Sequence, residues 1–440
     1  MSKETSIITG PASGFRDMMP EQMIPRQKMI DTIKSVYQGY GFVPFDTPAV
    51  EREDTLRGKS GDNRIYLVNN SFSDGTGEFL ALRFDLTVPL ARAVGQHLNE
   101  IKLPFKRYQV GNVWRGDRPQ AGRYREFMQF DADTVGGQGA IADAEIVAMM
   151  SDTMEGLRAK AYVRVNNRLI LDGLVEKAGI EKPEDKKYLV SIIDRLEKVG
   201  EEEVLSDIKD DFSEKTRDLV YGYLHVYGSP EQKLTQLNKL LDNQVTSEGV
   251  ENLQQVFKIL QFSGYDTEKV VFDQTIARGL NYYTGIIYET TLKDNPGIGS
   301  VCSGGRFDHL IEALGGPDLP AVGTSVGVDR LFEGLRQIGQ IDSSKTNSEV
   351  LVANMDDTQA HEYMKIASTL RKNGIPTEVY FERKKLGNQF KLADDMGISW
   401  VALAGEDEMS KGVVRFRNST TKEEFDIPVN EISDFIKKNR

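Results

Sequence analysis

The sequence predicts an α+β protein in which an antiparallel sheet core carries helices, a helical insertion and a C-terminal α/β domain. Three observations support this fold class. Four strand-like runs follow one another between residues 64 and 136, residues 160 to 262 are rich in helical spacing and charge, and strands alternate with helices beyond residue 349. The 440 residues exceed the roughly 250 to 300 at which a single core stops growing, so several domains are expected.

The start of the chain predicts a helix and an edge strand. Apolar residues recur at helical spacing from 21 to 40, and the pattern ends at Gly41. The run GFVPFDTPAVE follows, and Pro44 and Pro48 restrict it to an edge strand or an extended interface segment. A packing role and an interface role both remain open.

An antiparallel sheet is expected next. Gly, Asp and Ser clusters separate the four runs RIYLVNN, EFLALRFDLTVP, FKRYQVGNVWR and REFMQFDADTVG. Apolar residues from Ile146 to Leu157 then predict a helix, strand character returns at 281 to 291, and a further helix is expected from Val328 to Ile338.

Composition shifts divide the chain into five segments. The polar stretch GQIDSSKTNS has the composition of a linker. We predict a sheet domain in two parts, residues 1–160 and 263–338, with a helical insertion at 161–262 between them. A linker at 339–348 and a C-terminal α/β domain at 349–440 follow.

Overall charge and cysteine usage exclude several classes of protein. The net charge of −12 and pI of about 5.1 argue against coating nucleic acid through overall positive potential. A single cysteine, Cys302, excludes an internal disulfide and a Cys-rich zinc site, and the four histidines offer no ligand pair at metal-binding spacing. Without a long apolar segment or a signal-like start, a soluble, cytoplasmic protein that does not enter a membrane is expected.

Polar residues alternate along REFMQFDAD. Strand periodicity places Gln129, Asp131 and Asp133 on one face, together with Arg125 and Phe127. The wet side of a half-buried sheet is the common explanation of such a pattern. The same periodicity groups a second set of polar residues in LRFDLTVP: Arg83, Asp85 and Thr87. If two neighbouring strands present these carboxylates to one concave surface, a cationic ligand rich in hydrogen-bonding groups would suit them.

A cluster of arginines follows the third strand. Arg115, Arg118, Arg123 and Arg125 lie within eleven residues punctuated by Gly and Pro, and guanidinium groups bind phosphate bidentately. An exposed basic hairpin explains the cluster equally well. The sequence has neither G-x-x-x-x-G-K-[ST] nor G-x-G-x-x-G, so any phosphate site is of another kind. The glycines before Arg330 in AVGTSVGVDRL would let that side chain reach back along the sheet.

Taken together and in order, these segments resemble the histidyl-tRNA synthetases, a family of class II aminoacyl-tRNA synthetases. Residues 21–51 resemble motif 1, residues 105–136 motif 2 and residues 321–331 motif 3. Two further runs, ARGLNYYTGIIYE and SVCSGGRFDHL, resemble stretches peculiar to the histidine enzymes. The resemblance covers nearly the whole chain and implies a catalytic domain in two parts, an insertion domain and an anticodon-binding domain.

The resemblance also implies a reaction and its participants. Histidine and ATP would form histidyl-adenylate and pyrophosphate with Mg²⁺, and histidine would then pass to the 3′ end of its tRNA. The implied partners are tRNA(His), bound through acceptor stem and anticodon, and a second copy of the chain in a homodimer. No protein nucleophile is needed, because displacement at phosphorus depends on positioning and charge stabilisation.

Residue roles follow from the resemblance position by position. Arg115 and Arg278 would act on the α-phosphate, and the remaining ATP contacts would be Arg123, Arg330 and, at the adenine end, Asp117. The implied ligands of the α-ammonium group of histidine are Asp85, Thr87 and Gln129. Its imidazole would be addressed by Asp133 and Tyr283, with Tyr282 completing the histidine site.

Three positions depart from the family pattern, and two other functions remain open. Asn281 stands where aspartate is usual, Phe307 where tyrosine is usual, and Gly116 shortens the side chain in the motif 2 loop. The alternatives are a histidine-sensing paralogue without catalysis, such as the regulatory subunit of ATP phosphoribosyltransferase, and a class II synthetase for another amino acid.

Overall fold

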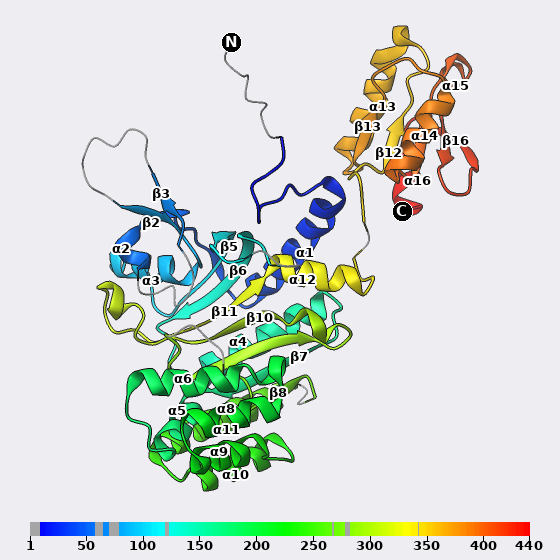
Figure 1. Ribbon diagram of the computed structural model, residues 1–440. Helices are drawn as coiled ribbons and strands as arrows, with labels where there is room; N and C mark the ends of the chain where they lie inside the picture. The colour runs from blue at the N-terminus through cyan, green and yellow to red at the C-terminus, as the bar shows by residue number, and fades with distance from the viewer. Residues whose placement is uncertain are drawn as a thin grey trace, which may run out of the picture. The chain divides into compact units, whose positions relative to one another are not determined.

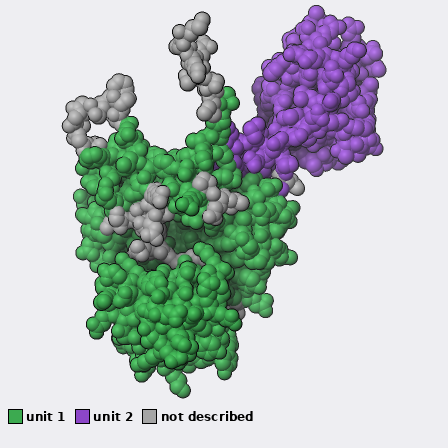
Figure 2. Space-filling model, in the orientation of Figure 1, with its two compact units in different colours: residues 1–16, 29–340 green, residues 17–28, 341–440 purple. Residues whose placement is uncertain are grey.

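The protein is described by a computed structural model, whose elements Figure 1 labels in chain order. The described residues are 9–57, 65–69, 79–118, 123–265, 268–277, 282–341 and 343–440. Two compact units divide the chain, coloured separately in Figure 2: residues 1–16 with 29–340, and residues 17–28 with 341–440. The bounds of the five segments given above stay a prediction.

An eight-stranded sheet forms the centre of the first unit, in the order β1-β5-β6-β11-β10-β9-β7-β8. Its strands are β1 Val43–Pro44, β5 Phe105–Trp114, β6 Glu126–Val135, β7 Ala161–Asn167, β8 Val270–Phe272, β9 Ile286–Leu292, β10 Ser300–Arg306 and β11 Ala321–Gly327. All pairs from β5 to β7 are antiparallel, and only the outer pairs β1/β5 and β7/β8 are parallel. The predicted antiparallel core is therefore confirmed, with the Pro44 segment at its edge.

Three helices agree with the apolar spacing of the sequence: α1 Pro20–Gly39, α4 Gly139–Gly156 and α12 Val328–Gln337. Two more, α2 Glu53–Leu56 and α3 Thr87–Gln96, were not predicted. Helix α4 packs on β7, β9, β10 and β11, and its Ile146, Met149 and Met150 are almost fully buried. Such burial of apolar side chains contributes roughly 1.5–3 kcal/mol for each.

The predicted strand across residues 83–87 is wrong. Strand β4 covers only Leu80–Leu82 and pairs with β2 Val50–Arg52 and β3 Leu67–Val68 in a separate three-stranded sheet. Thr87 is the first residue of helix α3. Asp85 and Asp133 thus do not lie on neighbouring strands. They approach each other because the chain turns between β4 and α3.

Seven helices, α5 to α11, form the insertion. Their bounds are α5 Arg168–Lys177, α6 Pro183–Asp194, α7 Leu196–Val199, α8 Glu201–Asp211, α9 Glu214–Leu224, α10 Pro230–Leu241 and α11 Gln244–Phe262. Side-chain caps begin several of them; Ser213, Ser229 and Asn243 each accept a hydrogen bond from a first-turn amide. Residues 161–167, within the range predicted as helical, form β7 of the central sheet instead.

The second unit contains a small mixed sheet, as the sequence predicts. Strands run in the order β13-β12-β14-β15-β16, parallel from β13 to β14 and antiparallel beyond. The strands are β12 Val350–Val352, β13 Thr377–Val379, β14 Trp400–Leu403, β15 Val413–Asn418 and β16 Glu424–Pro428; the helices are α13 Ala360–Lys372, α14 Leu386–Met396, α15 Glu406–Ser410 and α16 Ile432–Lys438. The described part of the chain also contains three short 3₁₀ turns: η1 Pro296–Ile298, η2 Glu312–Leu314 and η3 Asp357–Gln359.

The strand expected at 281–291 begins later. It starts at Ile286, because Tyr282 and Tyr283 pack instead against a cluster of apolar residues that includes Phe307. A helix long and apolar enough to cross a bilayer is not found within the described ranges.

Candidate active site

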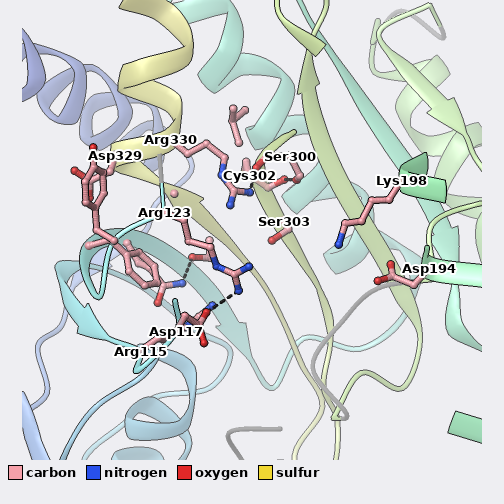
Figure 3. A pocket seen from close by; sticks show the side chains of 16 residues that line it. Arg115, Asp117, Arg123, Asp194, Lys198, Ser300, Cys302, Ser303, Asp329 and Arg330 are labelled. Carbon is pink, nitrogen blue, oxygen red and sulfur yellow. Dashed lines mark hydrogen bonds and ion pairs between the residues drawn. The ribbon is translucent and has the colours of Figure 1, made fainter. Parts of the chain in front are cut away.

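A cavity of about 350 Å³ opens along the central sheet (Figure 3). Five of the residues singled out by resemblance line it together: Arg115, Asp117, Arg123, Gln129 and Arg330. Residues not singled out complete the lining: Tyr124, Phe127, Asp194, Lys198, Ser300, Val301, Cys302, Ser303, Ser325, Gly327 and Asp329. Figure 3 shows Arg123 and Arg330 on one side of the cavity, and Lys198 and Asp194 of the helical insertion on the other.

Arg115 is fixed at the end of β5. Its Nε donates to the carbonyl oxygen of Phe84 at 3.0 Å, and its guanidinium carbon lies 5.0 Å from the centre of the Phe127 ring. Burial lowers the pKa of Arg115, and the nearby Asp85 carboxylate opposes that effect. Since the guanidinium remains charged at neutral pH, it can meet an anion in the cavity.

The other two cavity arginines are also positioned by the protein. Arg123 Nη2 lies 2.6 Å from Asp117 Oδ2, and Arg330 Nη1 donates to the Ser300 carbonyl at 2.8 Å. Arg118 is exposed and does not line the cavity. Two of the four clustered arginines, Arg115 and Arg123, therefore line a shared space with Arg330 that suits phosphate groups, whereas Arg118 and Arg125 do not line it.

The polar face of β6 is buried. Asp131 and Asp133 are 1% and 2% exposed, so this face is not the wet side of the sheet. Asp133 lies opposite Arg107 on β5 and Gly323 on β11. Arg107, fully buried, places Nη2 2.8 Å from Asp133 Oδ2. Burial raises the pKa of Asp133 to about 7, against the lowering effect of Arg107.

Gln129 joins the buried carboxylates to the cavity. Its Nε2 donates to the Ser325 hydroxyl at 2.6 Å, while its Oε1 has no hydrogen-bond partner among the described residues. A buried amide oxygen without a hydrogen-bond partner can accept a hydrogen bond from a donor group of a ligand.

Asp85 lies before helix α3. Its Oδ1 accepts from the amide of Val88 in the first turn of the helix at 3.1 Å, and its Oδ2 meets no donor in the described part of the chain. Burial raises the pKa of Asp85 to about 7, although the Val88 amide and Arg115 lower it. Asp85 and Arg115 are therefore close enough for their charges to interact, so the buried carboxylates lie near the arginines of the cavity.

Two tyrosines cover the carboxylates. The Tyr282 and Tyr283 rings pack edge to face at 5.1 Å, and the Tyr282 ring lies 6.0 Å from that of Phe307. The Tyr282 hydroxyl hydrogen-bonds Thr87. Tyr283 packs against Gly305, where a side chain would meet its ring. Burial raises the pKa of both phenols, so both stay neutral hydrogen-bonding groups.

Several residues around the site escaped sequence reasoning. Alternation along β5 places Arg107 on the same face as Gln109. Its pairing with Asp133 could have been predicted if the register of β5 against β6 had been known. Arg16 carries no such signal; its Nη2 reaches Asp329 Oδ1 at 2.6 Å, and its guanidinium lies 3.7 Å from the Tyr124 ring centre. Lys198 comes from a charged helical stretch that looks like an ordinary solvated face.

The positions of Arg278 and Asn281 fall outside the described residues. Gly116 and Phe307 are described: Phe307 is buried in the cluster that holds Tyr282. The consequence of Asn281 for activity therefore remains an expectation from the sequence.

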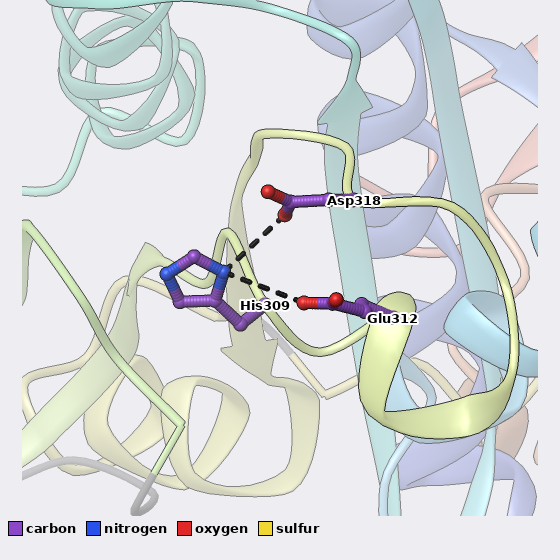
Figure 4. A group of neighbouring side chains, drawn as sticks. All are labelled: His309, Glu312 and Asp318. Carbon is purple, nitrogen blue, oxygen red and sulfur yellow. Dashed lines mark hydrogen bonds and ion pairs between the residues drawn. The ribbon is translucent and has the colours of Figure 1, made fainter.

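An exposed group of three side chains lies apart from the cavity (Figure 4). His309 Nδ1 is 3.2 Å from Asp318 Oδ1 and 3.9 Å from Glu312 Oε2, and all three side chains are exposed. Exposed ion pairs of this kind contribute about 0–1 kcal/mol each. We interpret the group as surface ion pairs.

Comparisons with known proteins agree with the geometry. A family model described as "Histidyl-tRNA synthetase" matches residues 14–331, and one described as "Anticodon binding domain" matches residues 349–439. A histidine–tRNA ligase of Rhodopirellula baltica is 39% identical over 422 residues, 94% of each chain. One of Clostridium tetani is 39% identical over 435 residues, 96% of this chain and 97% of its own.

Solved structures are similar over nearly the full length. The crystal structure of a histidyl-tRNA synthetase from Nostoc sp. PCC 7120 covers 99% of this chain and 100% of its own, at 33% identity and a TM-score of 0.89. A Bacillus halodurans protein described as an ATP phosphoribosyltransferase regulatory subunit/histidyl-tRNA synthetase covers 91% of this chain and 99% of its own, at 20% identity and a TM-score of 0.76, which shows a shared fold alone. By its full-length matches, its sheet and its cavity, the chain belongs to the histidyl-tRNA synthetase family.

Proposed function

We propose that this chain is a histidine–tRNA ligase that activates histidine with ATP and transfers it to the 3′ end of tRNA(His). The observation that carries the proposal is a cavity lined by three arginines and by Gln129, whose strand continues into the buried carboxylates Asp131 and Asp133. A cationic amino acid suits the carboxylates and a polyphosphate the arginines.

The chemistry needs alignment and charge stabilisation. The histidine carboxylate attacks the α-phosphorus of ATP, an acyl–phosphate bond forms, and pyrophosphate leaves. A terminal ribose hydroxyl of the tRNA then attacks the carbonyl carbon of the adenylate, and AMP leaves. Arg115 would meet the α-phosphate, because its Nε is held by Phe84 while its guanidinium faces the cavity. Arg278 would assist it, as the resemblance implies.

The remaining residues take complementary roles in the proposal. Arg123 and Arg330 would hold the outer phosphates and Asp117 the adenine end. Asp85, Thr87 and Gln129 would bind the α-ammonium group of histidine. Asp133 and Tyr283 would bind its imidazole, and Tyr282 would complete the histidine site. A site that hydrogen-bonds both ring nitrogens rejects analogues lacking them by about 10⁴- to 10⁵-fold.

We propose that Mg²⁺ binds together with ATP. Asp117 is paired with Arg123, and Asp329 binds Arg16 and the Met128 amide, so neither is a ready metal ligand. The one group of three metal-ligating side chains among the described residues is the surface group at His309. Mg²⁺ would therefore be held by the phosphates of ATP, whose charge it neutralises.

Histidine-dependent exchange of pyrophosphate into ATP tests the proposal. Exchange with histidine, and none with a panel of other amino acids, is the expected result. Histidine binding without exchange would instead support a sensing paralogue, and exchange with another amino acid would reassign the substrate. Exchange restored only in Asn281→Asp would mean that Asn281 has inactivated the chain.

Binding of tRNA is tested separately. From Glu349 to Arg440 there are 14 Lys and Arg and 16 Asp and Glu, a difference of −2, so tRNA binding by this region depends on local charge. Arg383, Lys384 and Lys385 are exposed beside Phe381, which is 92% exposed. Filter binding with salt-dependent affinity for tRNA is expected. Affinity without salt dependence, or none, would exclude the anticodon-binding role.

A further inference from the structure

Asp131 is a buried carboxylate to which no role has been given so far. It lies in the middle of β6 between Gln129 and Asp133, and it is 1% exposed. Across the sheet it faces Gln109 on β5 and Ser325 on β11. Its side chain thus belongs to the same polar face as the two proposed histidine ligands on this strand.

Neither oxygen of Asp131 has a hydrogen-bond partner among the described residues. The Ser325 hydroxyl accepts from Gln129, which leaves its O–H free to point at Asp131, and it lowers the pKa of that carboxyl. Opposite, Gln109 Nε2 donates to Asp46 at 2.6 Å and to Thr47 at 3.2 Å. Of these two neighbours Gln109 is engaged elsewhere, and one hydroxyl can serve only one of the two Asp131 oxygens.

The cations that face Asp131 are engaged as well. Arg107 pairs with Asp133, Arg83 donates to the carbonyls of Thr47 and Asn112, and Arg115 donates to that of Phe84. A buried charge without a partner disfavours the folded state, and natural sites retain one where a ligand completes it. No group of three metal-ligating side chains in the described ranges includes Asp131, so an organic cation is the better partner.

We propose that Asp131 is a further binding residue of this site and contacts a cationic nitrogen of histidine, the α-ammonium group or the protonated imidazole. The inference rests on the proposed function and adds a third carboxylate to Asp85 and Asp133. Asp133 is paired with Arg107, so Asp131 adds negative charge for a positively charged substrate.

The variant Asp131→Asn keeps the shape of the side chain and removes its charge. Because the variant loses a charged hydrogen bond to histidine, we expect the KM for histidine in pyrophosphate exchange to rise roughly 10- to 100-fold. The KM for ATP should stay unchanged. Without ligand, the Tm is expected to stay equal or rise by about 1–3 °C, since an unpaired buried charge is gone. The increase of Tm that histidine causes in the wild type should be largely lost.

Thr134→Val is the matched control. Thr134 is also buried on β6, its hydroxyl also has no partner among the described residues, and its side chain points to the opposite face. This variant should leave both KM values unchanged. An unchanged KM for histidine in Asp131→Asn, or a lower Tm with both KM values raised together, would mean that Asp131 is structural.

Two analogues distinguish the nitrogen that is bound. Imidazolepropionate lacks the α-ammonium group, and histidinol retains it together with the ring. If Asp131 binds the ammonium group, Asp131→Asn weakens histidinol but not imidazolepropionate in a thermal-shift titration. If it binds the ring, both weaken. Because this titration measures binding alone, it tests Asp131 even if the wild type shows no exchange, the result that would count against the proposed function.

Discussion

Gly323 determines how closely β11 can approach the carboxylates of β6. A Cβ at this position would overlap the Asp133 carboxylate, and the Gly323 carbonyl accepts a hydrogen bond from the Tyr288 hydroxyl at 2.6 Å. Gly304, on the next strand, would overlap that same carbonyl if it carried a side chain. Glycine is needed at these positions for space, not for an unusual backbone conformation.

Gly323→Ala is therefore expected to displace Asp133 and lower kcat/KM for histidine by about 100-fold, the typical effect of a displacement near 1 Å. Pyrophosphate exchange measures it. Gly297→Ala is the control, because a Cβ there meets nothing within 4 Å. Equal activity of the two variants would contradict the assignment of Asp133.

The buried carboxylates predict how histidine binding depends on pH. Burial raises the pKa values of Asp85 and Asp133 to about 7 and that of Asp131 to about 6, so these carboxyls take up protons as the pH falls below neutral and then accept less well from a cation. The KM for histidine should fall as pH rises from 6 to about 8, the window in which these groups ionise. The KM for ATP, measured in the same assay, should change much less. A flat histidine profile would contradict the prediction.

At the scale of elements, one arginine connects the helical insertion to the central sheet. Arg164 on β7 lies 2.6 Å from Glu197 on α7 and 2.7 Å from Asp273, which follows β8. Although burial acts in the opposite direction, Arg164 and Thr275 together lower the pKa of Asp273. This bridge holds the short segment that carries Asp194 and Lys198 to the cavity.

Arg164→Met should lower the free energy of unfolding by about 1–3 kcal/mol, since two carboxylates lose their partner. The loss should be present above pH 4 and disappear at lower pH, because a carboxylate with a lowered pKa stabilises the fold only while it is ionised. Urea unfolding at pH 7 and pH 3.5 measures it. In the control Lys269→Met, an exposed pair with Glu155 is removed, which should change stability by less than about 1 kcal/mol.

Elements with regular spacing were predictable, and those set by tertiary contacts were not. The β6 face, α12 and the mixed C-terminal sheet follow from periodicity alone. The start of α3 was missed because Thr87 and Val88 favour strands, and because Pro89, unfavourable within a helix, is tolerated in its first turn. Burial of Asp131 was missed because periodicity assigns residues to a face without saying what covers it.

At the scale of the whole molecule, the edge of the central sheet at β1 is a candidate surface for pairing with a second copy of the chain. Among the described strands, β1 pairs with β5 alone, and Val43 in β1 is 48% exposed. An exposed apolar edge strand invites pairing with another chain. The homodimer implied by the motif 1 resemblance would cover this segment.

Val43→Asp should therefore shift the protein from dimer to monomer, because a charge would be buried between the copies. Size-exclusion chromatography with light scattering measures the mass. Val429→Asp is the control: Val429 is 37% exposed, in the second unit, and its replacement should leave the mass unchanged. A monomeric wild type would exclude the dimer.

The single cysteine has a practical consequence. Cys302 is 2% exposed, and burial raises the pKa of its thiol to about 12, although a hydrogen bond with Thr324 at 3.0 Å lowers it. A thiol of this kind reacts slowly with maleimides, which require the thiolate and access. Cysteines introduced elsewhere can thus be labelled selectively in the otherwise native protein. Fluorophores on the two units would then report movement during the reaction while the native thiol remains in place.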